Sequence, residues 1–277
     1  MIELPETYVL ASQINKTLEG KLIVKAIANE HPHSFAWYSG DPKDYGKKLK
    51  NKKITNANPG TGYTCGGNTE IICEDMLLVI STPIKYHAPG EKLPKSHQLL
   101  LEFDDASHMS CTVQMWGAMF CYPLNENGLP ENYTIKKSPD PLTDAFDKAY
   151  FDSLWKEVKM SLSAKAFLAT EQRIPGLGNG VLQDILWNAR INPRRKLETI
   201  GSKEQKKLFT SLKSTLLAMR DQGGRDTEKD LFGNKGGYKC ILSANTLKDP
   251  CLVCGNSIIR EAYLGGNVYF CPVCQPL

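Results

Sequence analysis

The spacing of hydrophobic positions changes part-way along this chain of 277 residues. In the first half, apolar residues fall into short runs separated by turn signals such as Asn58-Pro59-Gly60 and Pro89-Gly90. Runs of this kind, bounded by Gly, Pro and Asn, are typical of strands. The expected strands cover residues 22–28, 34–38, 53–56, 69–73, 76–81, 98–103, 110–115 and 119–122. Their regular spacing predicts an antiparallel sandwich or barrel.

A helix is expected before the first strand. Its apolar stripe consists of Val9, Leu10, Ile14 and Leu18. Pro5 suits a first helical turn, Glu3 and Glu6 favour the positive end of the helix dipole, and Gly20 suits the C-cap. We therefore expect the chain to enter its β-rich half from one helix.

Beyond residues 123–142 the apolar period becomes 3.6, which predicts helices. The expected helices cover residues 146–154, 158–168, 181–189 and 202–221. Residues 123–142 are rich in Pro, Asn and Gly, so we interpret them as an interdomain linker. The predicted fold class is α+β, with a β-sandwich and its leading helix over residues 1–135, a helical domain over 136–245 and a small C-terminal module over 246–277.

The C-terminal module is identified by its cysteines. Cys251 and Cys254 form one CxxC, sixteen residues follow, and Cys271 and Cys274 form a second. Two such pairs on tight turns place four thiolates around one tetrahedral Zn²⁺ of structural role. Two disulfides or four free thiols remain the alternatives. Residues 258–263 and 267–270 read as two strands joined through residues 264–266, so we expect a zinc-stapled β-hairpin.

Composition and charge limit the class of protein. The hydrophobic content of 41% suits a soluble globular chain, and no apolar run is long enough to span a membrane. The N-terminus lacks a signal-peptide pattern, so we expect a reducing, cytoplasmic location at the nucleoid, with the other five cysteines as thiols. Residues 1–150 hold 15 basic and 18 acidic residues, whereas residues 151–277 hold 19 and 12. A polyanion site is therefore expected in the second half.

A glycine-rich stretch lies between two of the predicted helices. Gly176, Gly178 and Gly180 occupy three of five positions, and a helix is expected to follow Asn179 as its N-cap. Glycines spaced in this way imply a backbone with positive φ or a close approach to another group. Free amides at such a helix N-terminus would suit a phosphate. A glycine-rich turn without a ligand is the alternative.

These features together are more specific than any one alone. A helix that begins Glu3-Leu4-Pro5-Glu6, a β-rich half, a helical half with Gly-Leu-Gly-Asn at 176–179, and the final CxxC–x16–CxxC resemble the formamidopyrimidine-DNA glycosylase / endonuclease VIII family. The resemblance spans the whole chain and is closest over residues 165–190 and 223–275. It implies a β-sandwich and a helix–two-turn–helix domain flanking a DNA cleft, with the zinc hairpin reaching into the minor groove. It also implies that Lys165, the Gly178 backbone and Asn179 hold phosphates.

At one position this chain departs from the residues that carry the family's chemistry. In the family an N-terminal proline amine attacks C1′ of a flipped nucleotide and an adjacent glutamate acts as acid and base, which leads to β-elimination. Glu3 matches that glutamate and Glu6 the second helix-cap glutamate, but Ile2 stands at the proline position. The free amine would then belong to Met1, one residue away, because a bulky Ile2 hinders removal of the initiator methionine.

Other positions of the family pattern are also changed. Residues 63–68, where a sandwich-domain lysine is expected, contain none. The hairpin tip at residues 264–266 lacks the family arginine, and the nearest cations are Arg260 and Lys248. Gln114-Met115-Trp116-Gly117 resembles the segment that wedges into the base stack, with Trp116 able to stack and Gln114 able to hydrogen-bond the orphaned base.

Three further groups of residues have open interpretations. Arg225 lies in a segment that matches the family's lesion-facing loop, where it could face the flipped nucleotide or belong to a mobile surface loop. Arg194-Arg195-Lys196 could contact phosphate or form a solvated face. The proline between His31 and His33 disfavours a metal pair, and His87, His97 and His108 read as solvated loop residues.

The function expected is a damaged-DNA-binding protein that resembles a base-excision-repair DNA glycosylase and AP lyase. The DNA-gripping frame is predicted to be kept while the covalent chemistry is lost or rerouted. The alternatives are a non-catalytic reader of lesions or abasic sites, and a zinc-stapled RNA-binding or protein-interaction module. The expected partner is double-stranded DNA, damaged or abasic, bound by a monomer that does not associate with membranes and carries one structural zinc.

Overall fold

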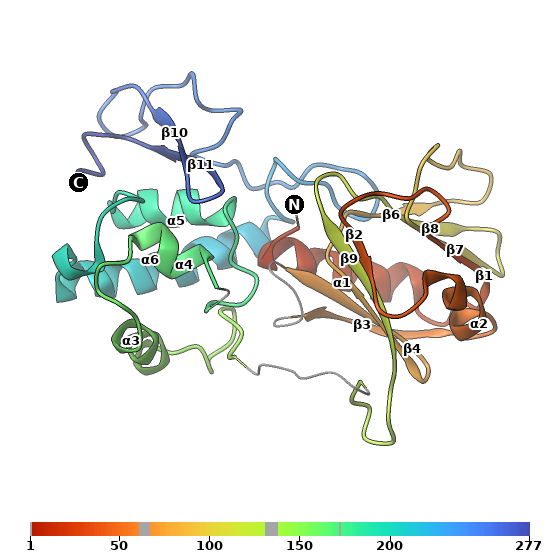
Figure 1. The fold of residues 1–277 in the computed structure, drawn as a ribbon. Coiled ribbons are helices and arrows are strands. Elements are labelled where there is room, and N and C mark those ends of the chain that lie inside the picture. The colour runs from red at the N-terminus through yellow and green to blue at the C-terminus, as the bar shows by residue number, and fades with distance from the viewer. Residues whose placement is uncertain (1, 61–66, 131–137, 172) are drawn as a thin grey trace.

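The computed structural model describes residues 2–60, 67–130, 138–171 and 173–277. Figure 1 shows a β-rich half and a helical half side by side, with the C-terminal hairpin above the helices. The change from β-type to helical spacing along the sequence therefore marks a real division of the chain. The α+β prediction is confirmed.

The β-rich half contains two sheets. The five-stranded sheet has the order β2-β9-β5-β4-β3 and the four-stranded sheet the order β1-β7-β8-β6. The strand bounds are β1 Ile23–Ala28, β2 Ala36–Tyr38, β3 Ile54–Gly60, β4 Asn68–Cys73, β5 Met76–Ile80, β6 Ile84–His87, β7 Leu99–Phe103, β8 His108–Cys111 and β9 Gly117–Pro123. Every residue of β5 is buried, as expected of a central strand.

One pairing differs from the antiparallel prediction. β2 runs parallel to β9, with Ala36 opposite Gly117 and Tyr38 opposite Met119. β2 reaches the five-stranded sheet from β1 in the other sheet, so no hairpin turn fixes its direction. The alternation of apolar residues does not determine whether an edge strand such as β2 runs parallel or antiparallel to its neighbour.

The helices are α1 Leu4–Leu18, α2 Tyr45–Leu49, α3 Lys148–Lys156, α4 Ala164–Ala169, α5 Val181–Ala189 and α6 Ser202–Asp221. The predicted helix over residues 158–168 is too long, because Ser163 accepts a hydrogen bond from the Ala166 amide and caps α4 there. The predicted strand over 110–115 is also displaced, since β8 ends at Cys111. Both β6 and α2 were missed because each is too short to show a period.

Helix α1 contributes to two hydrophobic cores. Leu10, Ile14 and Leu18 belong to the core of the β-rich half, whereas Leu4 belongs to the core of the helical half. The Leu4 amide also donates to the Gly176 carbonyl at 2.9 Å. The two halves are thus joined by a shared helix as well as by the linker.

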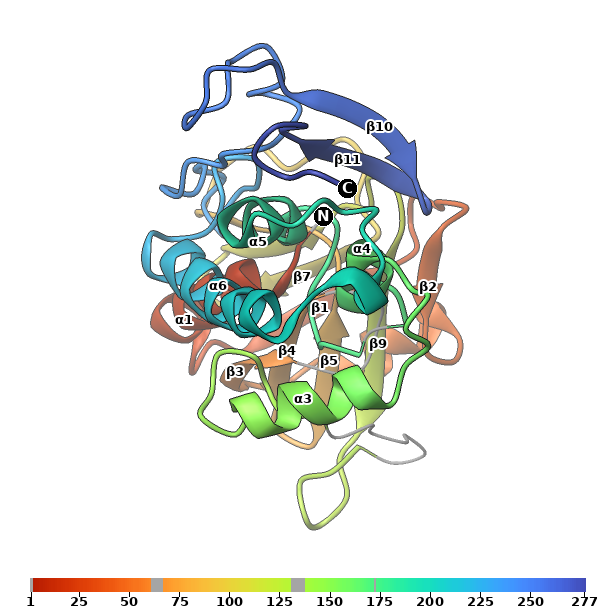
Figure 2. The same ribbon diagram turned by 90° about the vertical axis from the view of Figure 1, so that its left-hand side faces the viewer.

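The hairpin consists of β10 Ile259–Tyr263 and β11 Gly266–Phe270. It lies against α5, where the Tyr269 amide donates to the Gln183 side chain at 3.0 Å, and Figure 2 shows the hairpin above α5. Trp187 of α5 packs with Tyr269 and Cys271 in a small third core. Among the described residues, no helix has the length and apolarity needed to cross a membrane.

Candidate functional site

The start of α1 meets the glycine-rich turn that precedes α5. Both oxygens of the buried Glu3 carboxylate accept backbone amides of that turn, Oε1 from Gly180 and Oε2 from Val181, each at 2.8 Å. A carboxylate at a helix N-terminus is stabilised by these amides and by the helix dipole. The prediction of free amides for a phosphate is therefore wrong for Gly180 and Val181, because Glu3 occupies them. Gly180, not Asn179, is the N-cap of α5.

The glycines themselves are required by this contact. A Cβ on Gly178 would lie 2.5 Å from Cδ of Glu3, and one on Gly180 would lie 1.7 Å from Nη1 of Arg225. Gly176 has a φ of +70° and faces Leu4. The predicted close approach is confirmed, and the approaching group is the protein's own N-terminal helix.

Glu6 and Arg225 form a buried ion pair beside Glu3. Arg225 donates from Nη2 to Glu6 Oε2 at 2.7 Å and from Nε to Oε1 at 3.0 Å, and its Nη1 lies 3.7 Å from Glu3. Burial acts to raise the pKa of the Glu6 carboxyl, but the Arg225 guanidinium outweighs burial and holds the pKa below its ordinary value. The neighbouring glutamates hold the pKa of Arg225 well above its ordinary value against burial.

The segment that carries Arg225 is bonded to the rest of the molecule, and Arg225 itself is buried, not at the surface. Leu231 is buried in the core of the β-rich half, donates to the Gln13 side chain at 2.9 Å and accepts from the Tyr86 amide at 2.8 Å. Gly224 accepts from the Tyr238 amide at 3.0 Å. Arg225 thus lies in a braced segment between α1, α6 and β6.

Lys165, Asn179 and the hairpin come together on the other side of the same turn. Nζ of Lys165 donates to the Tyr263 carbonyl at 2.5 Å, and Nδ2 of Asn179 donates to the Asn267 carbonyl at 2.8 Å. Burial lowers the pKa of Lys165. Oδ1 of Asn179 is buried and has no hydrogen-bond partner among the described atoms. The structure thus brings two predicted phosphate-binding residues to the tip of the hairpin.

The hairpin tip itself presents Leu264 and Gly265 in left-handed conformations, as a two-residue turn demands. Arg260, three residues before the end of β10, donates to the Asn267 side chain at 3.3 Å. Arg194 pairs with Glu261 at 3.2 Å and stacks on the Tyr263 ring, while Arg195 is bound to Glu204. Both arginines of the 194–196 run therefore make internal ion pairs.

Residue 2 lies in the hydrophobic core. Ile2 is 2% exposed and packs with the buried residues of the β-rich half. Met1 lies outside the described residues, as do residues 63–66, where the family lysine was expected. Gly67, just before β4, is described, and a Cβ on it would lie 2.5 Å from the Glu3 carbonyl carbon, so the chain there lies against the start of α1.

The predicted wedge, residues 114–116, lies on the β-rich half next to the edge strand β2. Gln114 is exposed and Met115 is 75% exposed. The Trp116 ring lies 5.7 Å from that of Trp37, which is 46% exposed. Trp37 was not predicted from the sequence, because only the parallel pairing of β2 with β9 brings it to Trp116.

The four cysteines of the two CxxC pairs converge as predicted. All four Sγ atoms lie within 4.8 Å of one another, with Cys251 and Cys274 3.8 Å apart and Cys254 and Cys271 3.4 Å apart. Four sulfurs around a tetrahedral Zn²⁺, each bonded at about 2.3 Å, are separated by about 3.8 Å. The donor set therefore fits that ion.

The histidines of the β-rich half are less solvated than predicted. His87 and His97 are buried, so the expectation of solvated side chains is wrong for both, although His97 does lie outside any strand. His87 ends β6, where its register partner is His108 at the start of β8, and its Nε2 lies 2.8 Å from Ser110 Oγ. His97 precedes β7 and contacts His31 and Glu30, a grouping that sequence spacing did not suggest.

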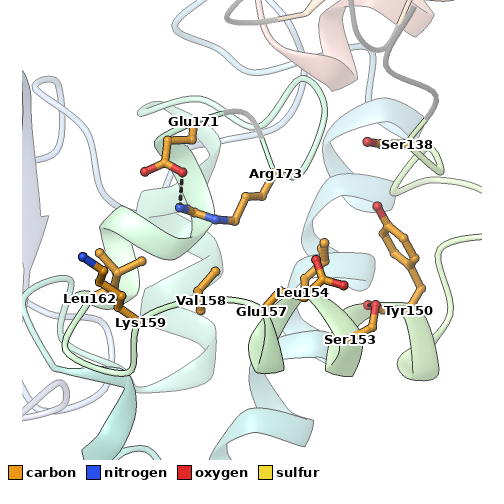
Figure 3. Close-up of a pocket in the computed structure, with 10 residues that line it drawn as sticks. All are labelled: Ser138, Tyr150, Ser153, Leu154, Glu157, Val158, Lys159, Leu162, Glu171 and Arg173. Carbon is orange, nitrogen blue, oxygen red and sulfur yellow. Dashed lines mark hydrogen bonds and ion pairs between the residues drawn. The ribbon is translucent and has the colours of Figure 1, made fainter.

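A hollow of about 630 Å³ lies on the helical half, away from these groups. Figure 3 shows Glu171 paired with Arg173 on one side of it and Tyr150 of α3 on the other. Arg173 also donates to the Ala166 carbonyl at 3.1 Å, so its guanidinium is already engaged. None of the described residues that line this hollow is Glu3, Glu6 or Arg225.

Similarity to known proteins identifies the family. The family model described as "Formamidopyrimidine-DNA glycosylase H2TH domain" matches residues 138–229. A formamidopyrimidine-DNA glycosylase of Listeria monocytogenes is 30% identical over 190 residues, which cover 67% of this chain and 68% of that protein. The chain belongs to the formamidopyrimidine-DNA glycosylase family.

Other members of the formamidopyrimidine-DNA glycosylase family align from end to end. The protein of Lactobacillus gasseri is 26% identical over 289 residues, covering 100% of this chain and 99% of its own. The MutM (Fpg) structure from Thermus thermophilus superimposes with a TM-score of 0.79 at 18% identity, covering 99% of this chain and 98% of its own. The Lactococcus lactis Fpg in complex with DNA containing an abasic site superimposes with a TM-score of 0.81 at 22% identity, covering 99% and 100%. At these identities the structures establish the shared fold.

Proposed function

We propose that this protein binds damaged or abasic duplex DNA and that its lyase chemistry through residue 2 is lost. A Lactococcus lactis relative of the same fold is described in complex with DNA containing an abasic site. The helical domain and the C-terminal hairpin of that fold are present in this chain, and we assign contact with the sugar-phosphate backbone to them. It differs at the residue that would perform the covalent step.

The observation that carries the proposal is the environment of Ile2. An amine nucleophile must reach C1′ of an extruded nucleotide, so the residue that bears it has to lie at an open surface. While Met1 is retained, the nitrogen of residue 2 is a peptide amide and not a free amine, and the Ile2 side chain packs into the core of the β-rich half. Its side chain anchors the start of α1, and a proline at this position would lose that packing.

The state of Glu3 also supports loss of chemistry. Its side chain is almost fully buried, and each of its oxygens accepts one backbone amide. A general base has to reach the proton that it removes, directly or through one water. Glu3 in this arrangement is a positioning residue that fixes α1 against α5.

The grip on DNA is assigned to the other face of the same turn. Asn179 meets the hairpin there, the buried Lys165 holds the hairpin tip through the Tyr263 carbonyl, and residues 151–277 carry a net charge of +7. Contacts between protein side chains and the sugar-phosphate backbone of DNA hold the duplex in place without reading its sequence. On the β-rich half, Trp116 supplies an aromatic face for the space that a flipped base leaves, and exposed Gln114 supplies hydrogen bonds for its partner.

We further propose that Cys251, Cys254, Cys271 and Cys274 hold one structural Zn²⁺. Their sulfur separations match a closed tetrahedral site, which offers no position for a substrate. The ion would cross-link the two ends of the hairpin. The side chains of α5 then hold the metal-pinned hairpin beside Asn179.

The binding experiment uses the full-length, zinc-loaded protein and three 25-mer duplexes: intact, carrying a tetrahydrofuran abasic analogue, and carrying a natural abasic site. Fluorescence anisotropy should give tighter binding to both abasic duplexes than to the intact one. Borohydride with the natural abasic duplex should give no covalent adduct, while a proline-bearing Fpg in parallel gives one. A covalent adduct at residue 2 would refute the loss of its lyase chemistry, an adduct at the Met1 amine would show that the chemistry is rerouted, and equal affinity for all three duplexes would refute damage recognition.

A water-using glycosylase is the second candidate, since Glu3 lies beside the turn that carries Asn179. Release of free base from a panel of lesion duplexes, scored separately from strand scission, would identify it. In that event Glu3→Gln should abolish release. Competition by structured RNA at equal affinity would instead favour the RNA-binding alternative.

A further inference from the structure

We propose that Glu30, His31 and His97 form a second metal site, which takes a divalent transition metal ion of the Zn²⁺ type. The site lies on the β-rich half and shares no residue with the four cysteines. It does not depend on the proposed function. We name it the Glu-His-His site.

The strand pairing of β1 with β7 brings the three residues together. Ala28, the last residue of β1, is the register partner of Leu99, the first residue of β7. The two chains stay bonded beyond the strands, because the Asn29 amide donates to the Gln98 carbonyl and the Gln98 side chain donates to the His31 carbonyl, each at 2.8 Å. Two segments separated by more than sixty residues in sequence therefore hold their side chains at one place.

The geometry is that of a three-ligand metal site. A carboxylate oxygen of Glu30 and one nitrogen of each histidine lie within 4.8 Å of one another. Nε2 of His97 is 3.1 Å from Oε2 of Glu30, and the two imidazole rings are 4.8 Å apart at 68°. Two imidazoles and one carboxylate are a ligand set that Zn²⁺ uses, and three protein ligands leave a further position for water.

The hydrogen bonding of the imidazoles points to a ligand. Nδ1 of His31 and Nδ1 of His97 are buried and have no hydrogen-bond partner among the described atoms. His97 is 6% exposed, so water does not readily serve it. A buried nitrogen without a partner is destabilising, and an ion would supply one for Nδ1 of His31, whereas His97 would bind the ion through Nε2, the nitrogen beside Glu30. The Glu30 side chain is 51% exposed, which leaves an open route for an ion.

His33 does not take part, although the sequence places it two residues from His31. Its Nδ1 accepts the Phe35 amide at 3.2 Å and its ring packs on Phe35. His33 therefore contacts Phe35, whereas His31 contacts His97. His33 provides a matched control in the same segment.

An ion at this site would stabilise residues 29–38, the segment that leads to the exposed Trp37. Gln98, adjacent to His97, accepts the Val113 amide at 2.7 Å and the Tyr38 hydroxyl donates to its carbonyl at 3.0 Å. Residues 29–38 and 113–116 are therefore tied to the same point. An ion bound there would hold the segment with Trp37 and the wedge in a fixed relation.

Metal content is the test. The full-length protein is incubated with Zn²⁺, passed through a desalting column and assayed for zinc per chain by mass spectrometry. We expect two equivalents in the wild type, one in His97→Gln and His31→Gln, and two in His33→Gln. One equivalent in the wild type, or two in His97→Gln, would overturn the proposal, and loss of one in His33→Gln would overturn the ligand set.

The exposed Glu30 provides a variant that does not disturb the core. Titration calorimetry with Zn²⁺, on protein whose cysteine site is already loaded, should give one further site in the wild type. Glu30→Gln should weaken that site by about tenfold or more, because a charged ligand is lost while the side-chain shape is kept. Unchanged affinity in Glu30→Gln would show that the histidines bind the ion without Glu30 and would overturn the three-ligand site.

Discussion

Replacing Arg225 by methionine should destabilise the protein strongly. The substitution keeps a long side chain but removes the cation that pairs with Glu6 through two hydrogen bonds in a fully buried setting. Removing one partner of a buried pair leaves an uncompensated charge and costs about 3–5 kcal/mol. The free energy of unfolding, measured by urea denaturation at pH 7, should fall by about that amount.

The pH dependence separates this cause from lost packing. The folded-state pKa of Glu6 lies below its ordinary value of 4.5, so its ionisation stabilises the wild type above that pH and the contribution is lost as pH falls through the lowered pKa. In Arg225→Met the guanidinium no longer opposes burial, and only the backbone amides of Glu3 and residue 225 still lower the pKa of Glu6, so this pKa rises and the variant is most destabilised at neutral pH. The difference between wild type and variant should therefore shrink as the pH is lowered toward 4.

Two further proteins complete the experiment. Arg194→Met removes a half-exposed arginine paired with Glu261 and should cost no more than about 1 kcal/mol. Adding Glu6→Gln to Arg225→Met removes the unpaired charge and should recover part of the stability. A loss in Arg225→Met as small as that in Arg194→Met, or one independent of pH, would refute the account of a buried ion pair.

Three other variants test the remaining parts of the site. Asn179→Ala should weaken binding to every duplex by about tenfold, the effect of losing one hydrogen bond to a charged group, and unchanged anisotropy at low salt would count against a phosphate contact. Trp116→Ala should weaken binding to abasic duplex by about tenfold and leave intact duplex little changed, and an equal loss for both would argue against stacking at the lesion. Cys271→Ser should release one zinc equivalent and raise amide exchange in β10 and β11, so retention of zinc would contradict the four-cysteine site.

The elements with a long, regular period were predictable from sequence. Helices α5 and α6 were placed at their observed bounds, because each presents an unbroken apolar face over nine or more residues. α4 was drawn too long because the apolar pattern continues before Ser163, where capping sets the boundary. β6 follows Pro83 and has four residues, too few for an alternation to stand out.

The candidate site shows where sequence reasoning stops. The glycines at 176, 178 and 180 predicted that another group approaches the backbone closely, but not which group. Glu3 is far away in the sequence and contacts this turn only in the folded chain. The same limit applies to His97, whose relation to Glu30 follows from the β1 and β7 register. Local spacing predicted the cysteine cluster because its ligands lie in two short turns.

The placement of Leu4 has a practical consequence for anyone who cuts the chain into pieces. Expressed alone, residues 136–277 would lack the side chain that fills the helical core beside Ile174 and Leu177, and residues 1–135 would expose that same leucine to solvent. A fragment made at the linker should therefore aggregate or need its counterpart supplied in trans, and calorimetry of the intact protein should record one cooperative melting event.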